Sequence, residues 1–122
     1  MLVKTSELSG VQLDWAVAQA EGEDAVLDED GDVATFKTVL GNEYKMLWKA
    51  STNWAQGGSI IERERIDINF FAKPVPELNY GCYATKTPFF ATGPTPLIAA
   101  MRCYVASKLG AEVEVPEMEE VK

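Results

Sequence analysis

The chain has 122 residues, of which 47% are hydrophobic, a fraction typical of a globular domain that buries its own core. Nineteen acidic side chains against 11 basic ones give a net charge of −8, which disfavours direct binding to nucleic acid or to an anionic membrane. Histidine is absent and cysteine occurs only twice, so the sequence lacks the commonest general base, the commonest metal ligand and a disulfide framework.

The first predicted element is a helix near residues 6–21. Ser9 and Gln12 have the spacing of a capping box, and Leu8 and Leu13 have that of a hydrophobic staple. Alanine, valine and leucine then recur at helical spacing. We expect this helix to be structural.

An acidic run follows at residues 23–32. If its glycine is placed at the glycine position of a calcium-binding loop, valine falls at the first ligand position and lysine at the last, where glutamate is required. The calcium motif therefore fails. The pattern favours a hairpin with a two-residue turn at Asp30-Gly31 between strands near 25–28 and 33–39.

The next segment predicts a second helix near residues 53–64, capped by Ser51 or Thr52. The pair Gly57-Gly58 weakens this helix by up to ~1 kcal/mol per glycine. Two interpretations of the pair stay open. It forms part of a phosphate-binding nest with Trp54 beside it as an aromatic platform, or it permits close approach to a neighbouring element.

Alternating apolar and polar residues predict further strands. The clearest is Ile66 to Phe70, which Pro74 and Pro76 follow as breakers. The expected strands outside the acidic hairpin lie near residues 44–48, 66–71, 81–85 and 112–115.

The best-specified element is a helix near residues 95–109. Thr95 is a good N-cap, Pro96 suits the first helical position, and Gly110 suits the residue after the last turn. Its apolar stripe should dominate the core and consists of Leu97, Ile98, Met101, Tyr104, Val105 and Leu109.

These elements predict an α+β domain over residues 1–116, in which helices pack on a small, mainly antiparallel sheet, followed by an acidic tail at 117–122. Neither a signal peptide nor an apolar run long enough to span a bilayer is visible, so we expect a reduced, cytoplasmic protein. Aromatic side chains crowd a loop-rich region and predict a homo-oligomer; they are Tyr80, Tyr83, Phe89 and Phe90.

Two blocks carry a resemblance to a known family. Residues 51–65 contain Ser-Thr-x-Trp-x-x-Gly-Gly-x-Ile-Ile-Glu-Arg, and residues 93–109 contain Gly-Pro-Thr-Pro-Leu-Ile-Ala-Ala-Met-Arg. From residue 5 to residue 116 the chain resembles the NinX-like proteins of tailed phages, short accessory proteins classed as a domain of unknown function. It is also similar, more distantly, to a phage domain described as an α/β/α sandwich. The resemblance implies helices on both faces of the sheet and a place in the host cytoplasm, and it supplies no catalytic residues.

Two functions from different classes follow as hypotheses. In the first, the protein is non-enzymatic and sequesters a nucleotide-like cytoplasmic ligand or signal during host takeover or counter-defence. Trp54 would stack on a base, and polar or phosphate groups would be held nearby. The candidate ligand-binding residues are Trp54, Gln56, Gly57, Gly58, Ser59, Gly93, Thr95 and Arg102. No cofactor, metal site or catalytic residue is expected.

In the second hypothesis, the protein is an acidic interaction protein that binds and inhibits a host protein through its negative face. An enzyme built on Cys103 is the weakest possibility, because that cysteine lies in the middle of the helix near 95–109 with no evident activating base.

Overall fold

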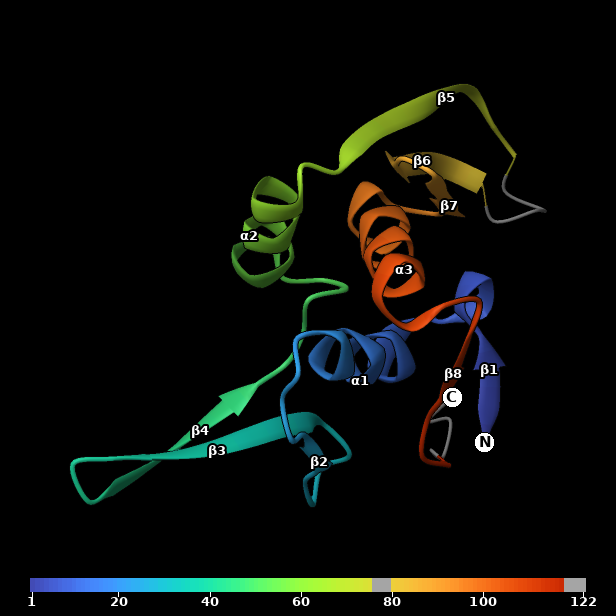
Figure 1. Cartoon of the computed structure of the whole chain (residues 1–122). Helices are drawn as coiled ribbons and strands as arrows, with labels where there is room; N and C mark the ends of the chain where they lie inside the picture. Colours follow the sequence, from blue (N-terminus) through green and yellow to red (C-terminus); the bar gives the residue numbers. More distant parts are fainter. Residues whose placement is uncertain (76–79, 118–122) are drawn as a thin grey trace.

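A computed structural model describes residues 1–75 and 80–117 and has an α+β architecture, as expected (Figure 1). Three helices are present in this part of the chain: α1 (Gly10–Ala20), α2 (Trp54–Glu64) and α3 (Pro96–Leu109), with a single 3-10 turn, η1 (Thr5–Glu7). The strands are β1 (Leu2–Lys4), β2 (Val26–Leu27), β3 (Val33–Val39), β4 (Asn42–Leu47), β5 (Asp67–Val75), β6 (Tyr80–Lys86), β7 (Phe89–Gly93) and β8 (Glu112–Glu114).

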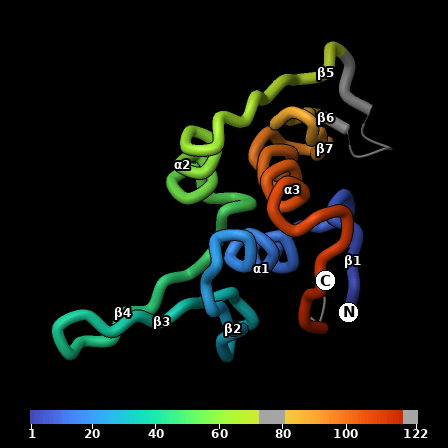
Figure 2. Tube along the Cα trace, viewed as in Figure 1, coloured from blue at the N-terminus to red at the C-terminus, as the bar shows by residue number. Residues whose placement is uncertain are grey.

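These strands form three small antiparallel sheets, with the orders β1-β8, β2-β3-β4 and β5-β6-β7. The sequence suggested one sheet with helices on both faces, so the antiparallel arrangement is as expected but the grouping is not. The β3–β4 hairpin projects away from the helices, and β1 pairs with β8 at the two ends of the chain (Figure 2). The strands β1 and β7 were not predicted.

Helix α3 is the central element of the fold, and it contacts the β5-β6-β7 sheet as well as α1 and α2. Its predicted caps are confirmed: the hydroxyl of Thr95 accepts a hydrogen bond from the Ile98 N–H at 3.1 Å, and Gly110 ends the helix with φ +92°. Nearly every residue from Leu97 to Val105 is buried, so the helix is covered on all sides.

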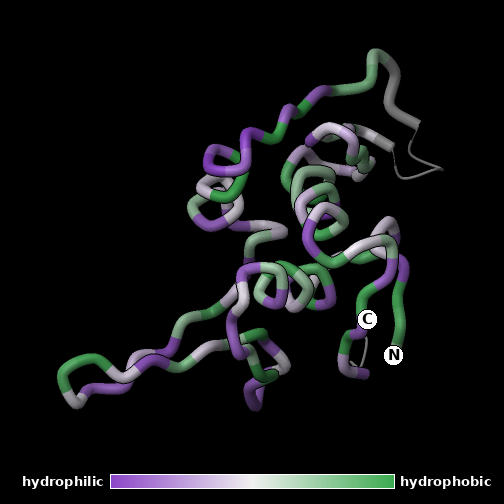
Figure 3. The backbone as a smooth tube through the Cα atoms, in the orientation of Figure 1, coloured by the Kyte–Doolittle hydropathy of each residue, from purple (hydrophilic) through white to green (hydrophobic). Residues whose placement is uncertain are grey.

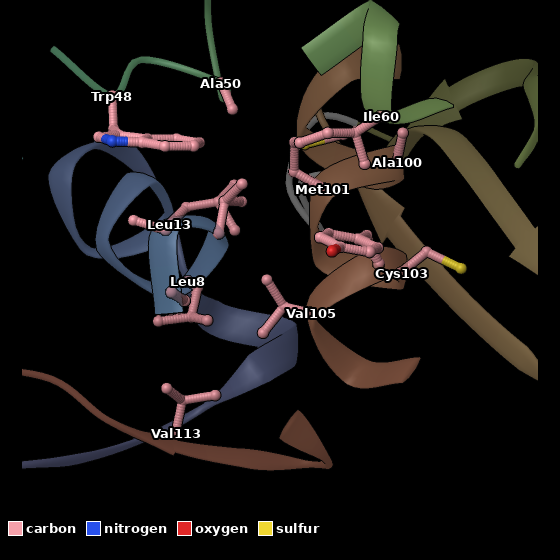
Figure 4. Close-up of a cluster of buried hydrophobic side chains, with 14 of the residues drawn as sticks. Leu8, Leu13, Trp48, Ala50, Ile60, Ala100, Met101, Cys103, Val105 and Val113 are labelled. Carbon is pink, nitrogen blue, oxygen red and sulfur yellow. The ribbon is translucent and has the colours of Figure 1, made fainter. Parts of the chain in front are cut away.

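Close packing on α3 depends on small residues. A Cβ atom at Gly93 would lie 2.7 Å from the Ala99 nitrogen, so β7 reaches the helix backbone only because residue 93 is glycine. Figure 4 shows Leu8 and Leu13 on the α1 side facing Met101 and Val105 of α3. Met101 is fully buried, as expected.

Leu109 does not belong to this core, contrary to the prediction. Its side chain is exposed because it lies in the last turn of α3, where the neighbouring residues Lys108 and Gly110 are exposed as well. The first helix also differs from the prediction. It begins at Gly10 because residues 5–7 form η1 and Leu8 is extended, and the Ser9 side chain makes no capping hydrogen bond.

The acidic hairpin pairs as predicted, with Val26 opposite Ala34, but its turn is longer than two residues. The loop spans residues 28–32 and is organised by the carboxylate of Asp28, which accepts hydrogen bonds from the N–H groups of Asp30 and Asp32, both at 2.9 Å. Lys45 lies 2.7 Å from the other oxygen of Asp28 and lowers the pKa of that carboxyl group.

Two further expectations concern the ends of the described ranges. Apart from Glu117, the tail expected at 117–122 lies outside the described residues, as does the side chain of Tyr80. No helix in the described part of the chain is long and apolar enough to cross a membrane.

Candidate functional site

A pocket of about 220 Å³ lies where the segment before α2 meets the start of α3. The predicted residues Trp54 and Thr95 come together here. Trp54 is 55% exposed, and the lining consists of Ser51, Thr52, Trp54, Thr95, Pro96, Leu97 and Ile98. We refer to this hollow as the Trp54 pocket.

Both helices begin at this pocket with a capped first turn. Asn53, rather than Ser51 or Thr52, caps α2, and its side-chain oxygen accepts hydrogen bonds from the N–H groups of Ala55 (2.8 Å) and Gln56 (3.2 Å). Thr95 caps α3 in the same manner. The positive ends of two helix dipoles therefore lie beside the pocket, where they favour a ligand with an electronegative edge.

The close approach of the two helices depends on Gly57. A Cβ atom at that position would lie 2.4 Å from Leu97 Cδ1 and 2.6 Å from the carbonyl oxygen of Ala50. The interpretation of Gly57, Gly58 and Ser59 as a phosphate nest is wrong, because all three residues lie inside α2, where backbone N–H groups donate along the helix.

Among the described residues, the polar groups that line the Trp54 pocket are hydroxyls, backbone groups and the indole N–H of Trp54, and no cationic side chain lines it. Ser51, which lines the pocket, is buried, and the Ser51 N–H donates to Asp14 Oδ1 at 2.9 Å. The Ser51 hydroxyl lies near the same carboxyl group without an aligned hydrogen bond among the described residues. Burial raises the pKa of Asp14, and the contacts with Ser51 offset part of this effect.

Gln56 and Ser59, also predicted as ligand-binding residues, use their polar atoms within the protein. The Gln56 side chain accepts a hydrogen bond from the Lys49 N–H and donates one to the Leu47 carbonyl oxygen, both at 2.6 Å. Ser59 donates to the carbonyl oxygen of Ala55 at 2.9 Å. Both residues line a second hollow of about 230 Å³, which we call the Trp48 hollow, with Glu21, Met46, Trp48, Ala55, Ile60 and Arg63.

Arg102 lies apart from the Trp54 pocket, although its side chain points inward. It is 5% exposed, and its guanidinium donates to the carbonyl oxygens of Leu8 (2.8 Å) and Thr92 (2.9 Å). Burial lowers the pKa of Arg102. It lines a third hollow of about 190 Å³, so five of the eight predicted site residues are divided among three hollows, while Gly57, Gly58 and Gly93 line none of the three.

A cluster that the sequence did not suggest links the three helices. The carboxylate of Glu21, at the end of α1, accepts hydrogen bonds from Arg63 of α2 at 2.7 and 3.0 Å and from the hydroxyl of Tyr104 of α3. Burial raises the pKa of Tyr104, and its hydrogen bond to Glu21 raises it further. These residues are distant in sequence and lie in no recognisable motif, so no local signal could have joined them.

The two cysteines are poor candidates for a nucleophile. Cys82 and Cys103 are both buried, and burial raises the pKa of each thiol, which keeps it protonated. Within residues 1–75 and 80–117, no group of three or more cysteine, aspartate or glutamate side chains is arranged to hold a metal ion.

A comparison with protein families identifies a match over most of the chain. The family model for bacteriophage P22 NinX matches residues 4–108, in agreement with the resemblance of the two sequence blocks. The family is a domain of unknown function. No curated protein matches the chain.

Proposed function

From the finding that the chain belongs to the bacteriophage P22 NinX family, we propose that it is a non-enzymatic phage accessory protein that binds a small nucleotide-like ligand in the host cytoplasm. The observation that carries the proposal is the exposed indole of Trp54, which forms one side of a pocket at the starts of α2 and α3. A large aromatic ring that is left exposed beside hydroxyl and backbone groups offers a stacking surface for a planar ring.

The pocket favours the base or nucleoside part of such a ligand. Its volume of about 220 Å³ lies below the range of roughly 300–1,000 Å³ that is common for drug-sized ligands, so it suits one ring system. Stacking on Trp54 is worth ~1–3 kcal/mol per base. A polyphosphate would gain little here, because no cationic side chain of the described residues lines the pocket and the net charge is −8.

A sequestering role is consistent with the remaining chemistry of the chain. The sequence has no histidine, and its two thiols are buried with raised pKa values. These features leave neither an imidazole base nor a reactive thiolate for catalysis at neutral pH. Sequestration requires only binding.

The proposal is tested by exposing the purified protein to a bacterial cytoplasmic metabolite extract and identifying retained compounds by mass spectrometry. We expect the wild type to retain a purine or pyrimidine compound and Trp54→Ala to lose it. Phe70→Ala is the matched control, because Phe70 is an exposed aromatic residue on β5 outside the pocket lining. Retention by Trp54→Ala equal to that of the wild type would rule out the pocket.

A second candidate is inhibition of a host protein through the acidic loop of residues 28–32. Glu29 and Asp30 are exposed in this loop, which the Asp28 side chain holds in a fixed shape. If this is the function, Glu29→Lys with Asp30→Lys abolishes binding of the host protein, whereas Trp54→Ala retains it. The opposite pattern favours the Trp54 pocket.

A further inference from the structure

Strand β4 forms one edge of the β2-β3-β4 sheet. In an antiparallel pair the hydrogen-bonded residue pairs alternate with pairs that are not hydrogen-bonded. The Trp48 N–H donates to the Val33 carbonyl oxygen at 2.8 Å, so these two opposite residues form a hydrogen-bonded pair. Lys37 and Tyr44 lie opposite each other four residues nearer the turn, an even number, so they form a hydrogen-bonded pair as well. The backbone N–H and C=O groups of Glu43 and Lys45 therefore point outward, toward the open edge.

The same hairpin exposes apolar side chains along its length. It projects from the body of the protein, and its tip is coloured as hydrophobic in Figure 3. Tyr44 is 56% exposed, and the other exposed apolar residues of the hairpin are Phe36, Val39, Leu40 and Met46. An isolated two-stranded hairpin is marginally stable in water, and an open edge with apolar side chains is suited to pairing with another strand.

We propose that two copies of the chain pair through their β4 strands, antiparallel, about a two-fold axis at Tyr44. This register places Glu43 of each copy opposite Lys45 of the other, and the two Tyr44 side chains opposite each other. In this register the outward-facing backbone groups of Glu43 in one copy form hydrogen bonds with those of Lys45 in the other copy. The two Tyr44 residues form the pair between them, which is not hydrogen-bonded. The result is a continuous six-stranded sheet across the dimer.

Charge selects this register over its neighbours. An axis at residue 43 would place two glutamates opposite each other, and an axis at residue 45 would do the same with two lysines, which is destabilising. Glu43 makes no ion pair within the described part of the chain, so its carboxylate is free to pair across the interface. Lys45 contacts Asp28 at 2.7 Å and still has two ammonium hydrogens for Glu43 of the second copy.

The hairpin tip supports the same arrangement. Leu40 is 96% exposed and has φ +52°, a conformation that is costly for leucine and natural for asparagine or glycine. In the proposed register Leu40 of one copy lies opposite Trp48 of the other. Trp48 lines the Trp48 hollow, together with the apolar residues Met46, Ala55 and Ile60. An exposed leucine at a strained turn is explained if its side chain packs against this hollow.

The first test is sedimentation velocity of the full chain at increasing concentration. We expect the wild type to sediment as a dimer, with twice the chain mass of 13.4 kDa. Glu43→Lys should raise the dissociation constant by about tenfold or more, because both interface pairs become repulsive. Adding Lys45→Glu to this variant restores opposite charges at both positions and should return the constant to near the wild-type value. A wild type that stays monomeric at high micromolar concentration, or a dimer that Glu43→Lys leaves unchanged, overturns the proposal.

A cross-linking experiment covers the possibility that Lys45→Glu disturbs the acidic loop. Tyr44→Cys should form a disulfide between two copies under mild oxidation, because the two residues face each other within disulfide reach. Lys37→Cys lies on the same face of the neighbouring strand β3 and should not form this disulfide, because the β4 strands of both copies separate it from residue 37 of the other copy. The native cysteines are buried and do not compete. Equal cross-linking of the two variants contradicts the proposed register.

The tip contact has a separate test. Leu40→Asn suits the left-handed turn, so it should not lower the stability of the monomer, yet it should weaken the dimer about tenfold. An unchanged dimer dissociation constant contradicts the packing of Leu40 against the second copy. All three tests are independent of the Trp54 pocket and of any ligand bound there.

Discussion

The hydroxyl of Tyr104 donates a hydrogen bond of 2.5 Å to the carboxylate of Glu21, and this contact joins the central helix α3 to the end of α1. Arg63 of α2 binds the same carboxylate through two nitrogens and lies 3.2 Å from the Tyr104 hydroxyl. One carboxylate thus holds three helices together. Such bidentate pairs are stronger than ordinary surface ion pairs.

The Glu21 cluster should make stability depend on pH in the acid range. Burial raises the pKa of Glu21, but the hydrogen bonds from Arg63 and Tyr104 outweigh it and leave the pKa below its ordinary value of 4.5. A lowered folded-state pKa contributes stability above the unfolded value, and this contribution is lost as the pH falls through the folded value. Below about pH 4.5, we expect the free energy of unfolding, measured with urea, to fall more steeply with decreasing pH for the wild type than for Glu21→Gln.

Tyr104→Phe separates the hydroxyl from the ion pair. It should lower the free energy of unfolding at pH 7 by about 1–2 kcal/mol, because a hydrogen bond to a charged acceptor is lost while Glu21 and Arg63 remain paired. A Tyr104→Phe variant as stable as the wild type would show that this contact is unimportant for stability.

The two adjacent glycines of α2 should respond to alanine with opposite signs. Gly57→Ala places a methyl group against the Ala50 carbonyl oxygen and Leu97, so α2 must move away from α3 at a cost of about 1–3 kcal/mol. Gly58→Ala meets only the Trp54 ring at 3.7 Å and should stabilise the helix by up to ~1 kcal/mol. Thermal unfolding of both variants measures the difference. Equal effects would argue against the close helix contact.

Two apolar residues of α3 provide a matched test of the core. Met101→Asp should destabilise the protein by about 3–5 kcal/mol, because an unpaired carboxylate would be buried among apolar side chains. Leu109→Asp, at an exposed position of the same helix, should change stability by only about 0.5 kcal/mol. The comparison is made by urea unfolding, and similar losses at both positions would contradict the placement of α3.

Local signals explain why α3 could be predicted closely. Its cap, its first-turn proline and its terminal glycine act within a few residues of one another, and the structure uses all three. The strands β1 and β7 could not be found in this way. β1 is three residues long and pairs with β8 at the other end of the chain, so it is defined by a distant contact and not by its own pattern.

In the candidate site, too, some features follow from local signals and others depend on distant contacts. The position of Trp54 beside Thr95 followed from two predicted helix starts, whereas the direction of Arg102 depended on carbonyl groups of Leu8 and Thr92. The pattern of apolar residues in β3 and β4 does not indicate which of them are covered, because Val33 and Ala34 are buried whereas Phe36, Val39 and Tyr44 are exposed. Such a pattern is the same for a strand covered by its own chain and for one that a second copy would cover.

The most direct test of ligand binding at the Trp54 pocket is nuclear magnetic resonance of the tryptophan indole N–H groups during titration with nucleosides and nucleoside monophosphates. Trp54 is exposed in the pocket, whereas Trp48 is buried and donates to the Thr35 hydroxyl at 3.1 Å, so the two indoles report on different places. We expect the Trp54 resonance to shift in a saturable manner with at least one compound while the Trp48 resonance stays in place, and Trp54→Ala to abolish binding. A Trp54 resonance that moves with none of these compounds would contradict the proposed function.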